Sequence, residues 1–310
     1  MLRYVLKRIV QGVITVWFIA TATFFAMHAV PGDPLSNEKA TTAQIRQNLL
    51  VKYGLDRPWY AQYGIYIRNM SRGDFGISFT QQNRSVNDII REHFPVSATL
   101  GILSIVFAGV GGVLWGALTA LYRNRLPDVV IMFLVILGIS VPSFVFAALG
   151  QLGLVELNEV VGRTLLPVAG WGTVSHMLVP ALVLGLGTMA FLTRLMRSSM
   201  LEVLNADYIR TARSKGLPAP RIFLKHELRN ASLPVVTVLG PAIATITTGG
   251  FVVELVFAIP GLGRYFVQAV QQLDYTVIMG TTVFYGAFLV LMVIIVDVVY
   301  GFIDPRVRLE

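Results

Sequence analysis

The chain has 310 residues, of which 55% are hydrophobic and only 14% are charged, and its mean hydropathy is +0.68. Soluble domains carry about 25% charged residues, so this composition excludes an ordinary soluble enzyme and predicts an all-α protein that crosses a membrane several times. The net charge is +8. Because the basic residues lie mostly between apolar stretches, they indicate orientation in the membrane rather than nucleic-acid binding. Cysteine is absent, which excludes disulfides and thiolate metal sites.

The N-terminal 30 residues are predicted to form a cytoplasmic N-terminus and the first transmembrane helix. Residues 1–9 are basic, and residues 10–30 are apolar. The small residues at 20–22 are typical of a signal-peptidase site, but the apolar stretch continues well past them, so we expect an uncleaved span. The proline- and glycine-rich residues 31–34 end this helix.

A polar stretch, residues 31–95, is predicted to fold as an extracytoplasmic helical lobe. Helices are expected at residues 41–53, closed by Gly54, and at residues 58–70, and a third is expected to lead into Pro95. The second of these helices carries aromatic side chains that suit a membrane interface, namely Trp59, Tyr60, Tyr63 and Tyr66.

Residues 96–310 are predicted to form the core transmembrane domain, with five further spans that complete a set of six. The spans are expected at residues 96–122, 128–150 with a kink at Pro142, 176–196, 233–257 and 277–303. Residues 151–175 and 258–276 are expected to lie outside. Lys and Arg are concentrated in the segments that this arrangement places inside, which predicts that both termini are cytoplasmic.

The loop of residues 197–232 is the longest strongly polar segment in the second half of the chain. Its pattern predicts two short helices around a break. Asn205 or Asp207 is expected to cap the first helix, and Gly216 is expected to close it in the left-handed backbone conformation. Pro220 suits the first position of the second helix.

Residues 207–216 and 228–234 resemble the cytoplasmic "EAA" loop of permease subunits in binding-protein-dependent ABC importers. Arg210-Thr211-Ala212 stands where Glu-Ala-Ala is usual, and the spacing from Gly216 to Leu233-Pro234 is longer. In both features the segment resembles the oligopeptide, dipeptide and nickel branch of these permeases. The resemblance extends over nearly the whole chain through residues 31–34, 53–58 and 73–76.

This resemblance implies a type I ABC importer fold and a permease subunit that forms half of a peptide translocation path. It implies as partners a second homologous permease subunit in a heterodimer, two cytoplasmic ABC ATPase subunits and an extracytoplasmic peptide-binding protein. It also implies the cytoplasmic membrane of a bacterium or archaeon. The chain has no Gly-x-x-x-x-Gly-Lys-Ser/Thr motif, so ATP and Mg²⁺ would bind in the partner ATPases and not here.

Two other functions remain open at this stage. Import of nickel or another metal chelate belongs to the same branch, and an ion-coupled carrier is the alternative from a different class. A carrier is expected to show inverted repeats and discontinuous helices, which the sequence does not display clearly. The sequence also leaves open which peptides are carried.

The resemblance assigns coupling to the ATPases to the loop of residues 197–232, called the coupling loop below. Ala212 is expected to be a small contact point on the ATPase, and Gly216 is expected to shape the turn. The residues assigned to coupling are Asp207, Tyr208, Arg210, Thr211, Ala212, Arg213, Lys215, Gly216 and Leu217.

The fifth predicted span, residues 233–257, is small and weakly polar throughout. Such a helix can line a water-filled path, but close packing between helices explains the same residues equally well. For Glu254 and for Asp297 in the last span, structural pairing is favoured over a proton relay. The candidates for the translocation path are Thr237, Thr245, Thr248 and Glu254.

The sequence indicates no catalytic set and no metal site. His28, His93 and His176 all fall near the outer face on the predicted topology, but no pair has the close helical spacing of a metal motif. We therefore interpret these histidines as unrelated interfacial side chains.

Overall fold

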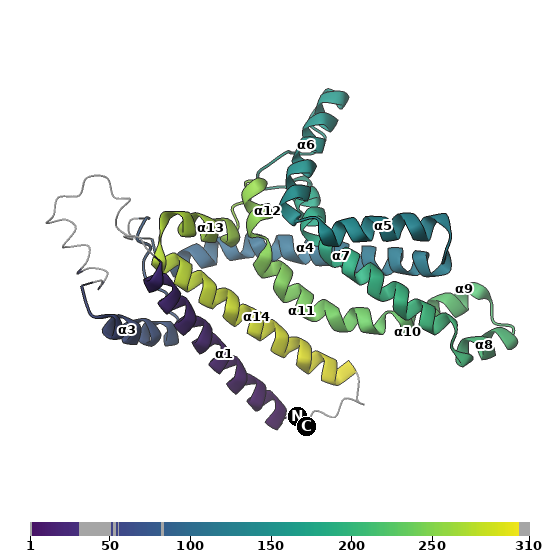
Figure 1. The fold of residues 1–310 in the computed structure, drawn as a ribbon, viewed down its shortest axis with the longest axis horizontal. Helices are drawn as coiled ribbons and strands as arrows, with labels where there is room; N and C mark the ends of the chain where they lie inside the picture. The colour runs from purple at the N-terminus through teal and green to yellow at the C-terminus, as the bar shows by residue number, and fades with distance from the viewer. Residues whose placement is uncertain (1, 31–50, 52–53, 55, 82–83, 304–310) are drawn as a thin grey trace. The chain divides into compact units, whose positions relative to one another are not determined.

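The computed structural model describes residues 2–30, 51, 54, 56–81 and 84–303. Within these residues the regular elements are helices, and one isolated β-bridge joins Ile77 to Ser85 (Figure 1). The predicted helix at 41–53, apart from residue 51, and the tail at 304–310 lie outside the described residues. The chain divides into two compact units, residues 1–97 with 260–310, and residues 98–259.

In the first unit, two long helices lie side by side, α1 (Leu2–Ala29) and α14 (Tyr275–Ile303). Glycines permit this contact. A Cβ atom on Gly12 would lie 2.6 Å from Val290 Cγ1, and one on Gly286 would lie 2.7 Å from Ile19 Cδ1. The short helix α13 (Leu262–Gln272) packs against α14.

The predicted helix at 58–70 is confirmed as α3 (Trp59–Ser71). Its aromatic residues divide between two roles. Trp59 and Tyr60 are exposed, as expected for an interface. Tyr63 instead packs against Phe24 of α1, with 5.3 Å between ring centroids, and Tyr66 stacks on the same ring at 5.8 Å.

In the second unit, α7 (Val174–Leu204) is the central helix. Against it pack α5, α6, α11 and α12, whose bounds are Leu126–Ser140, Ser143–Val161, Leu233–Gly249 and Phe251–Val256. Since α7 contacts all of them, its position determines the arrangement of this unit.

Helix α4 (Val86–Leu121) approaches α7 backbone to backbone. A Cβ atom on Gly116 would lie 2.7 Å from the carbonyl oxygen of Thr193, and one on Gly185 would lie 2.7 Å from that of Ser104. Small residues of this kind allow helices in a membrane to pack closely, where no hydrophobic effect drives them together.

An ion pair between a buried carboxylate and a partly exposed arginine joins α5 to α7. Asp128, which is 4% exposed, accepts hydrogen bonds of 2.8 Å from Nε and from Nη2 of Arg197. The backbone N–H of Asn124 donates to the same carboxylate at 2.9 Å. Such a two-point contact fixes orientation as well as distance.

The prediction that a helix ends at Pro95 was wrong, because α4 is a single helix of 36 residues that contains Pro95. A proline removes one backbone hydrogen bond from a helix. Tertiary contacts hold the turns on both sides of it: Phe94 packs edge-on against Phe284 at 4.7 Å, and Ser97 Oγ accepts the backbone N–H of Leu262 at 2.9 Å.

The prediction of one kinked span at 128–150 was also wrong. Val141 and Pro142 have ψ angles of 128° and 143°, which separate α5 from α6, and the extended geometry of Val141 follows from the proline after it. Helix α6 then continues to Val161 and is closed by Gly162 at φ +69°. Residues 151–161, expected in a loop, are therefore helical.

The fifth and fourth spans need smaller corrections. Gly250 interrupts the fifth span, so that α11 and α12 replace one helix. The fourth span extends beyond 196 to Leu204. By length and composition, five helices of the described chain suit a membrane, and six do so if the bent pair Ala219–Ala231 and Leu233–Thr247 counts as one span. The protein is thus an all-α polytopic membrane protein, as predicted.

Replacing Gly185 by alanine is expected to destabilise the second unit. The added Cβ would meet the backbone carbonyl of Ser104 at 2.7 Å, and overpacking of this kind costs about 1–3 kcal/mol. Gly153→Ala is the matched control, because no atom lies within 4 Å of its Cβ position. Thermal unfolding in detergent measures both variants. A Gly185→Ala protein that unfolds at the temperature of the Gly153→Ala protein would contradict the close approach.

Candidate functional site, the coupling loop

The first helix of the coupling loop, α8 (Asp207–Ser214), buries one face in a small core of its own. Ile209 and Ala212 are three residues apart and therefore lie on the same side of the helix. They are 0% and 8% exposed, and they pack against Ile222 of the following helix. Half-buried Leu217 adds to this core. The loop thus has a defined fold rather than being a flexible connection.

Gly216 closes α8 as predicted, with φ +71°. The backbone N–H of Leu217 donates to the carbonyl of Ala212 at 3.3 Å, and that of Gly216 donates to the carbonyl of Arg213 at 3.0 Å. This pair of bonds, with Leu217 packed near Ala212, is the Schellman arrangement for ending a helix. The turn direction is therefore fixed by the backbone.

The predicted cap of α8 was wrong. The capping position is Ala206, and no side chain bonds the first N–H groups. Asn205 instead ends α7, and its Nδ2 donates to the carbonyl of Leu201 at 2.8 Å. Asp207 is the first helical residue and lies 3.5 Å from Arg210. Its charge still favours the helix, because the N-terminus of a helix carries a partial positive charge.

The second helical stretch of the loop runs from Ala219 to Ala231 in three parts. It comprises α9 (Ala219–Ile222), a π-helical segment η1 (Phe223–Leu228) and α10 (Arg229–Ala231). Pro220 occupies the second position of α9 rather than the predicted first. The axis then bends by 47° into α11. A π segment inserts an extra residue per turn, and sequence reasoning missed it because it has no residue signature.

Two side-chain contacts tie α8 to this second stretch. Arg213 Nη2 donates to Glu227 Oε1 at 3.1 Å, and the Glu227 side chain is only 6% exposed. Asn230 Nδ2 donates to the hydroxyl of Tyr208 at 3.2 Å. Sequence reasoning missed both partners. Glu227 was detectable, because it is the single acidic residue within an otherwise basic stretch, 208–232.

The exposed surface of the loop differs from the expected one. Ala212 faces the internal core, so it does not project as a contact point for a partner. Tyr208 is 44% exposed and Leu224 is 62% exposed, which leaves two large apolar groups accessible. The same loop also exposes polar and cationic residues, namely Thr211, Arg210, Lys215, Arg221, Lys225 and Arg229.

The candidate path residues separate into two environments. Thr237 and Thr245 are exposed on α11, eight residues apart and therefore on nearly the same face. Their hydroxyls donate to the carbonyls of Leu233 and Pro241 at 3.0 Å each. Glu254, in contrast, is 2% exposed on α12, so it does not share this surface. The side chain of Thr248 lies outside the described part of the chain.

The three histidines make separate local contacts. Within the described residues, no group of three His, Cys, Asp or Glu side chains is placed to hold a metal ion. A ring nitrogen of His28 lies 3.2 Å from Gln62 Oε1, and one of His93 lies 2.8 Å from the carbonyl oxygen of Pro260. A ring nitrogen of His176 lies 2.7 Å from Thr173 Oγ1.

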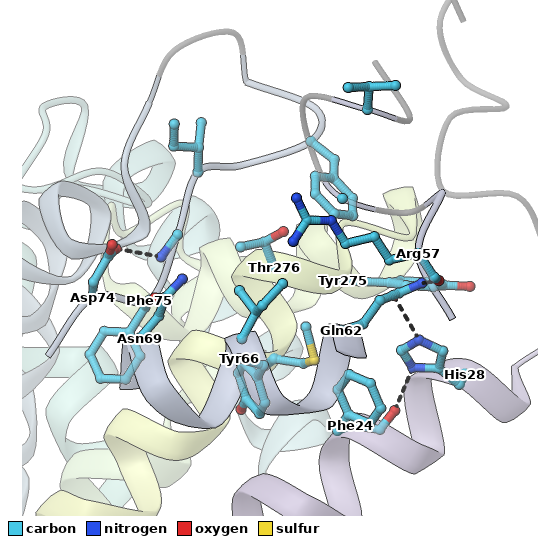
Figure 2. A pocket seen from close by; sticks show the side chains of 17 residues that line it. Phe24, His28, Arg57, Gln62, Tyr66, Asn69, Asp74, Phe75, Tyr275 and Thr276 are labelled. Carbon is cyan, nitrogen blue, oxygen red and sulfur yellow. Dashed lines mark hydrogen bonds between the residues drawn. The ribbon is translucent and has the colours of Figure 1, made fainter. Parts of the chain in front are cut away.

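A second candidate surface is a pocket of about 410 Å³ in the first unit, lined by α1, α3, residues 74–79 and the start of α14 (Figure 2). Asp74 and Arg57 border it from opposite sides. Asp74 Oδ1 accepts the backbone N–H of Gly76 at 2.9 Å. Burial raises the pKa of Tyr66, which lines the same pocket. A pocket with aromatic walls and both charges suits a polar ligand or a protein side chain.

Known families match almost the entire chain. The family described as "Binding-protein-dependent transport system inner membrane component" matches residues 112–309. The family of the N-terminal part of such membrane components matches residues 1–101.

Similar proteins are permeases of peptide transport systems. The chain is 46% identical over 310 residues to the dipeptide transport system permease protein DppB of Bacillus subtilis, covering 100% of this chain and 99% of that protein. It is 42% identical to the oligopeptide transport system permease protein OppB of Haemophilus influenzae, over 99% of this chain and 100% of that protein. It is 41% identical to DppB of Lactococcus lactis, with 100% of each chain covered.

Replacing Gly216 by valine is expected to destabilise the fold of the coupling loop. A β-branched residue at φ +71° is strained by about 1–3 kcal/mol, whereas asparagine tolerates this conformation better. Limited proteolysis of the purified protein is expected to cut the loop faster in Gly216→Val than in Gly216→Asn. Equal cleavage rates for wild type, Gly216→Asn and Gly216→Val would show that the left-handed turn does not hold the loop together.

Proposed function

The chain belongs to the family of binding-protein-dependent transport system inner membrane components, and we propose that it is the permease subunit of an ATP-driven peptide importer. The main support for this proposal is that the chain is 46% identical to a dipeptide permease over its full length. The relatives described above are named as dipeptide or oligopeptide permeases. These names favour peptides over nickel chelates as the substrate class.

Three kinds of partner complete this proposal. A second homologous permease would supply the other half of the path, two cytoplasmic ATPases would bind ATP and Mg²⁺, and an extracytoplasmic binding protein would deliver the peptide. The words "binding-protein-dependent" in the family description support the third partner, the binding protein. The ATPases are required because the sequence has no phosphate-binding loop of its own.

The geometry of the coupling loop supports a protein partner over a lipid surface. Arg197 pairs with Asp128 near the start of α5, and charged residues of this kind mark the end of a membrane span. From there α7 continues to Leu204, which adds about 10 Å at 1.5 Å per residue. The field of anionic lipids decays within about 8–10 Å, so the cations of α8 lie near or beyond its reach.

The loop is suited to transmit movement because its shape is fixed internally. Its core, its glycine turn and the Arg213–Glu227 pair leave Tyr208 and the cations free to dock. In alternating access, closure of the ATPases would move this rigid loop and rotate the helices attached to it. Helix α11 follows the loop directly, so its exposed Thr237 and Thr245 would move with it.

The topology is a further part of the proposal, with the coupling loop and both termini in the cytoplasm. The concentration of Lys and Arg in the coupling loop supports it.

In the cysteine-free chain, Lys215→Cys is expected to resist an impermeant thiol reagent added to intact cells, and Arg68→Cys on α3 is expected to react. Both positions are exposed. Labelling of position 215 from outside would reject this orientation.

Tyr208→Ala with Arg210→Glu is expected to uncouple the importer. Truncating a central interface tyrosine commonly costs about 2 kcal/mol or more, so reconstituted peptide uptake should fall at least tenfold while binding-protein docking is retained. Arg163→Glu, in the exposed loop after α6, is the matched charge control. Uptake and ATP hydrolysis are measured in vesicles at equal protein levels.

Two outcomes would contradict the proposal. Normal coupled uptake in the double variant would show that this surface does not dock the ATPases. Robust ATP hydrolysis by the purified chain without ATPase subunits would exclude a permease that depends on partners for ATP.

A further inference from the structure

A cavity of about 320 Å³ lies within the unit of residues 98–259, between α4, α5, α6 and α7. Its lining is apolar, with Trp115, Leu134, Leu137, Phe146 and Ala190 among the residues around it. The one lining hydroxyl, that of Thr193, already donates to the carbonyl of Met189 at 2.7 Å. A cavity lined almost entirely by apolar groups accepts apolar ligands rather than ordered water, which needs about two to four polar partners.

The residues along the mouth of the cavity are large and exposed. Trp115, Leu134 and Leu137 are 46%, 57% and 38% exposed. Interfaces between membrane helices are instead enriched in small residues that let backbones approach, as on the α4 side of α7. The character of the mouth therefore favours a flexible lipid chain over the helix of another subunit.

Cations lie at one end of the cavity. Along α5 and α7 the lining continues, one turn beyond Ile131 and Thr193, to the ion pair of Asp128 and Arg197. This pair uses Nε and Nη2 of the Arg197 guanidinium, which has five N–H donors in total. The cavity is thus lined by apolar side chains, and a charged pair follows one helical turn beyond its lining on α5 and α7.

Two further arginines flank this polar end. Arg194 follows Thr193 directly on α7, and Arg125 immediately precedes α5. Both are exposed, and within the described part of the chain neither forms an ion pair with a carboxylate. An apolar cavity that ends at unpaired cations between transmembrane helices matches an anionic lipid, whose chain and phosphate lie at opposite ends.

We propose that this cavity is a binding site for an anionic phospholipid, with one acyl chain among α4, α5, α6 and α7 and the phosphate against Arg194 and Arg125. The lipid belongs to the leaflet on the side of the α4–α5 connection. Because its headgroup site adjoins the Asp128–Arg197 pair, the lipid stabilises the packing of α5 on α7. The inference is independent of the transported substrate and of the coupling loop.

The test compares two lipids with identical dioleoyl chains, phosphatidylglycerol and phosphatidylcholine, on the purified full-length chain in detergent. Binding is measured by native mass spectrometry and by the rise in unfolding temperature. Each cation near an anionic headgroup contributes about fivefold in affinity, so phosphatidylglycerol should bind at least fivefold more tightly. Arg194→Gln should remove about fivefold of that preference and should weaken phosphatidylcholine less than phosphatidylglycerol, because the choline cation offsets the charge of the phosphate.

The acyl part is tested by filling the cavity. Leu134→Trp, at the mouth, should weaken both lipids about tenfold or more. Phe133→Trp is the control, because Phe133 is 59% exposed on the same helix but does not line the cavity. Equal binding of the two lipids, or unchanged lipid binding in Leu134→Trp, would overturn the proposal. So would a Leu134→Trp variant that loses only association with a second permease, since the groove would then be a subunit interface.

Discussion

Helix α7 can pack as it does only because glycines on α4 and on α7 itself let the two backbones meet. Gly116 and Gly185 each stand where a Cβ atom would lie 2.7 Å from a carbonyl oxygen of the opposite helix. In a bilayer, apolar side chains gain little by leaving lipid for protein, so close contact and buried polar pairs must supply the attraction. The contact between α4 and α7 meets that condition, and α5, α6, α11 and α12 are arranged on the helix that it fixes.

The same constraint explains where polar groups are placed. Asp128 and Arg197 join α5 to α7 through two hydrogen bonds, and the buried carboxylate also accepts the N–H of Asn124. A buried charge is tolerated when its hydrogen-bonding capacity is met in this way. Further along α7, the coupling loop repeats the principle on a smaller scale, with Glu227 buried against Arg213 across the two helices. Rigidity of the loop and rigidity of the bundle therefore have the same physical origin.

In a permease that depends on partners, different regions of the chain are suited to different roles. The interior of the coupling loop is packed, while Tyr208 and the cations of the loop are exposed and would be available to the proposed ATPases. Helix α11 begins directly after the loop and exposes Thr237 and Thr245, whereas its Thr247 is buried. The apolar cavity between α5 and α7 lies apart from both, and its lining contains no residue of either. A lipid there would act on stability and packing rather than on transport chemistry.

The sequence by itself determined the membrane class, the approximate spans, the two-helix form of the coupling loop and the left-handed turn at Gly216. These follow from local causes, namely hydropathy over about 20 residues and the steric freedom of glycine. Only the tertiary structure decided that α4 continues through Pro95 and that Ala212 faces inward. A proline bends or ends a helix according to the packing on both sides of it, as Phe94 and Ser97 illustrate. The burial of Ala212 likewise depends on Ile222, which belongs to another helix, and contacts between separate helices are not encoded in any local pattern.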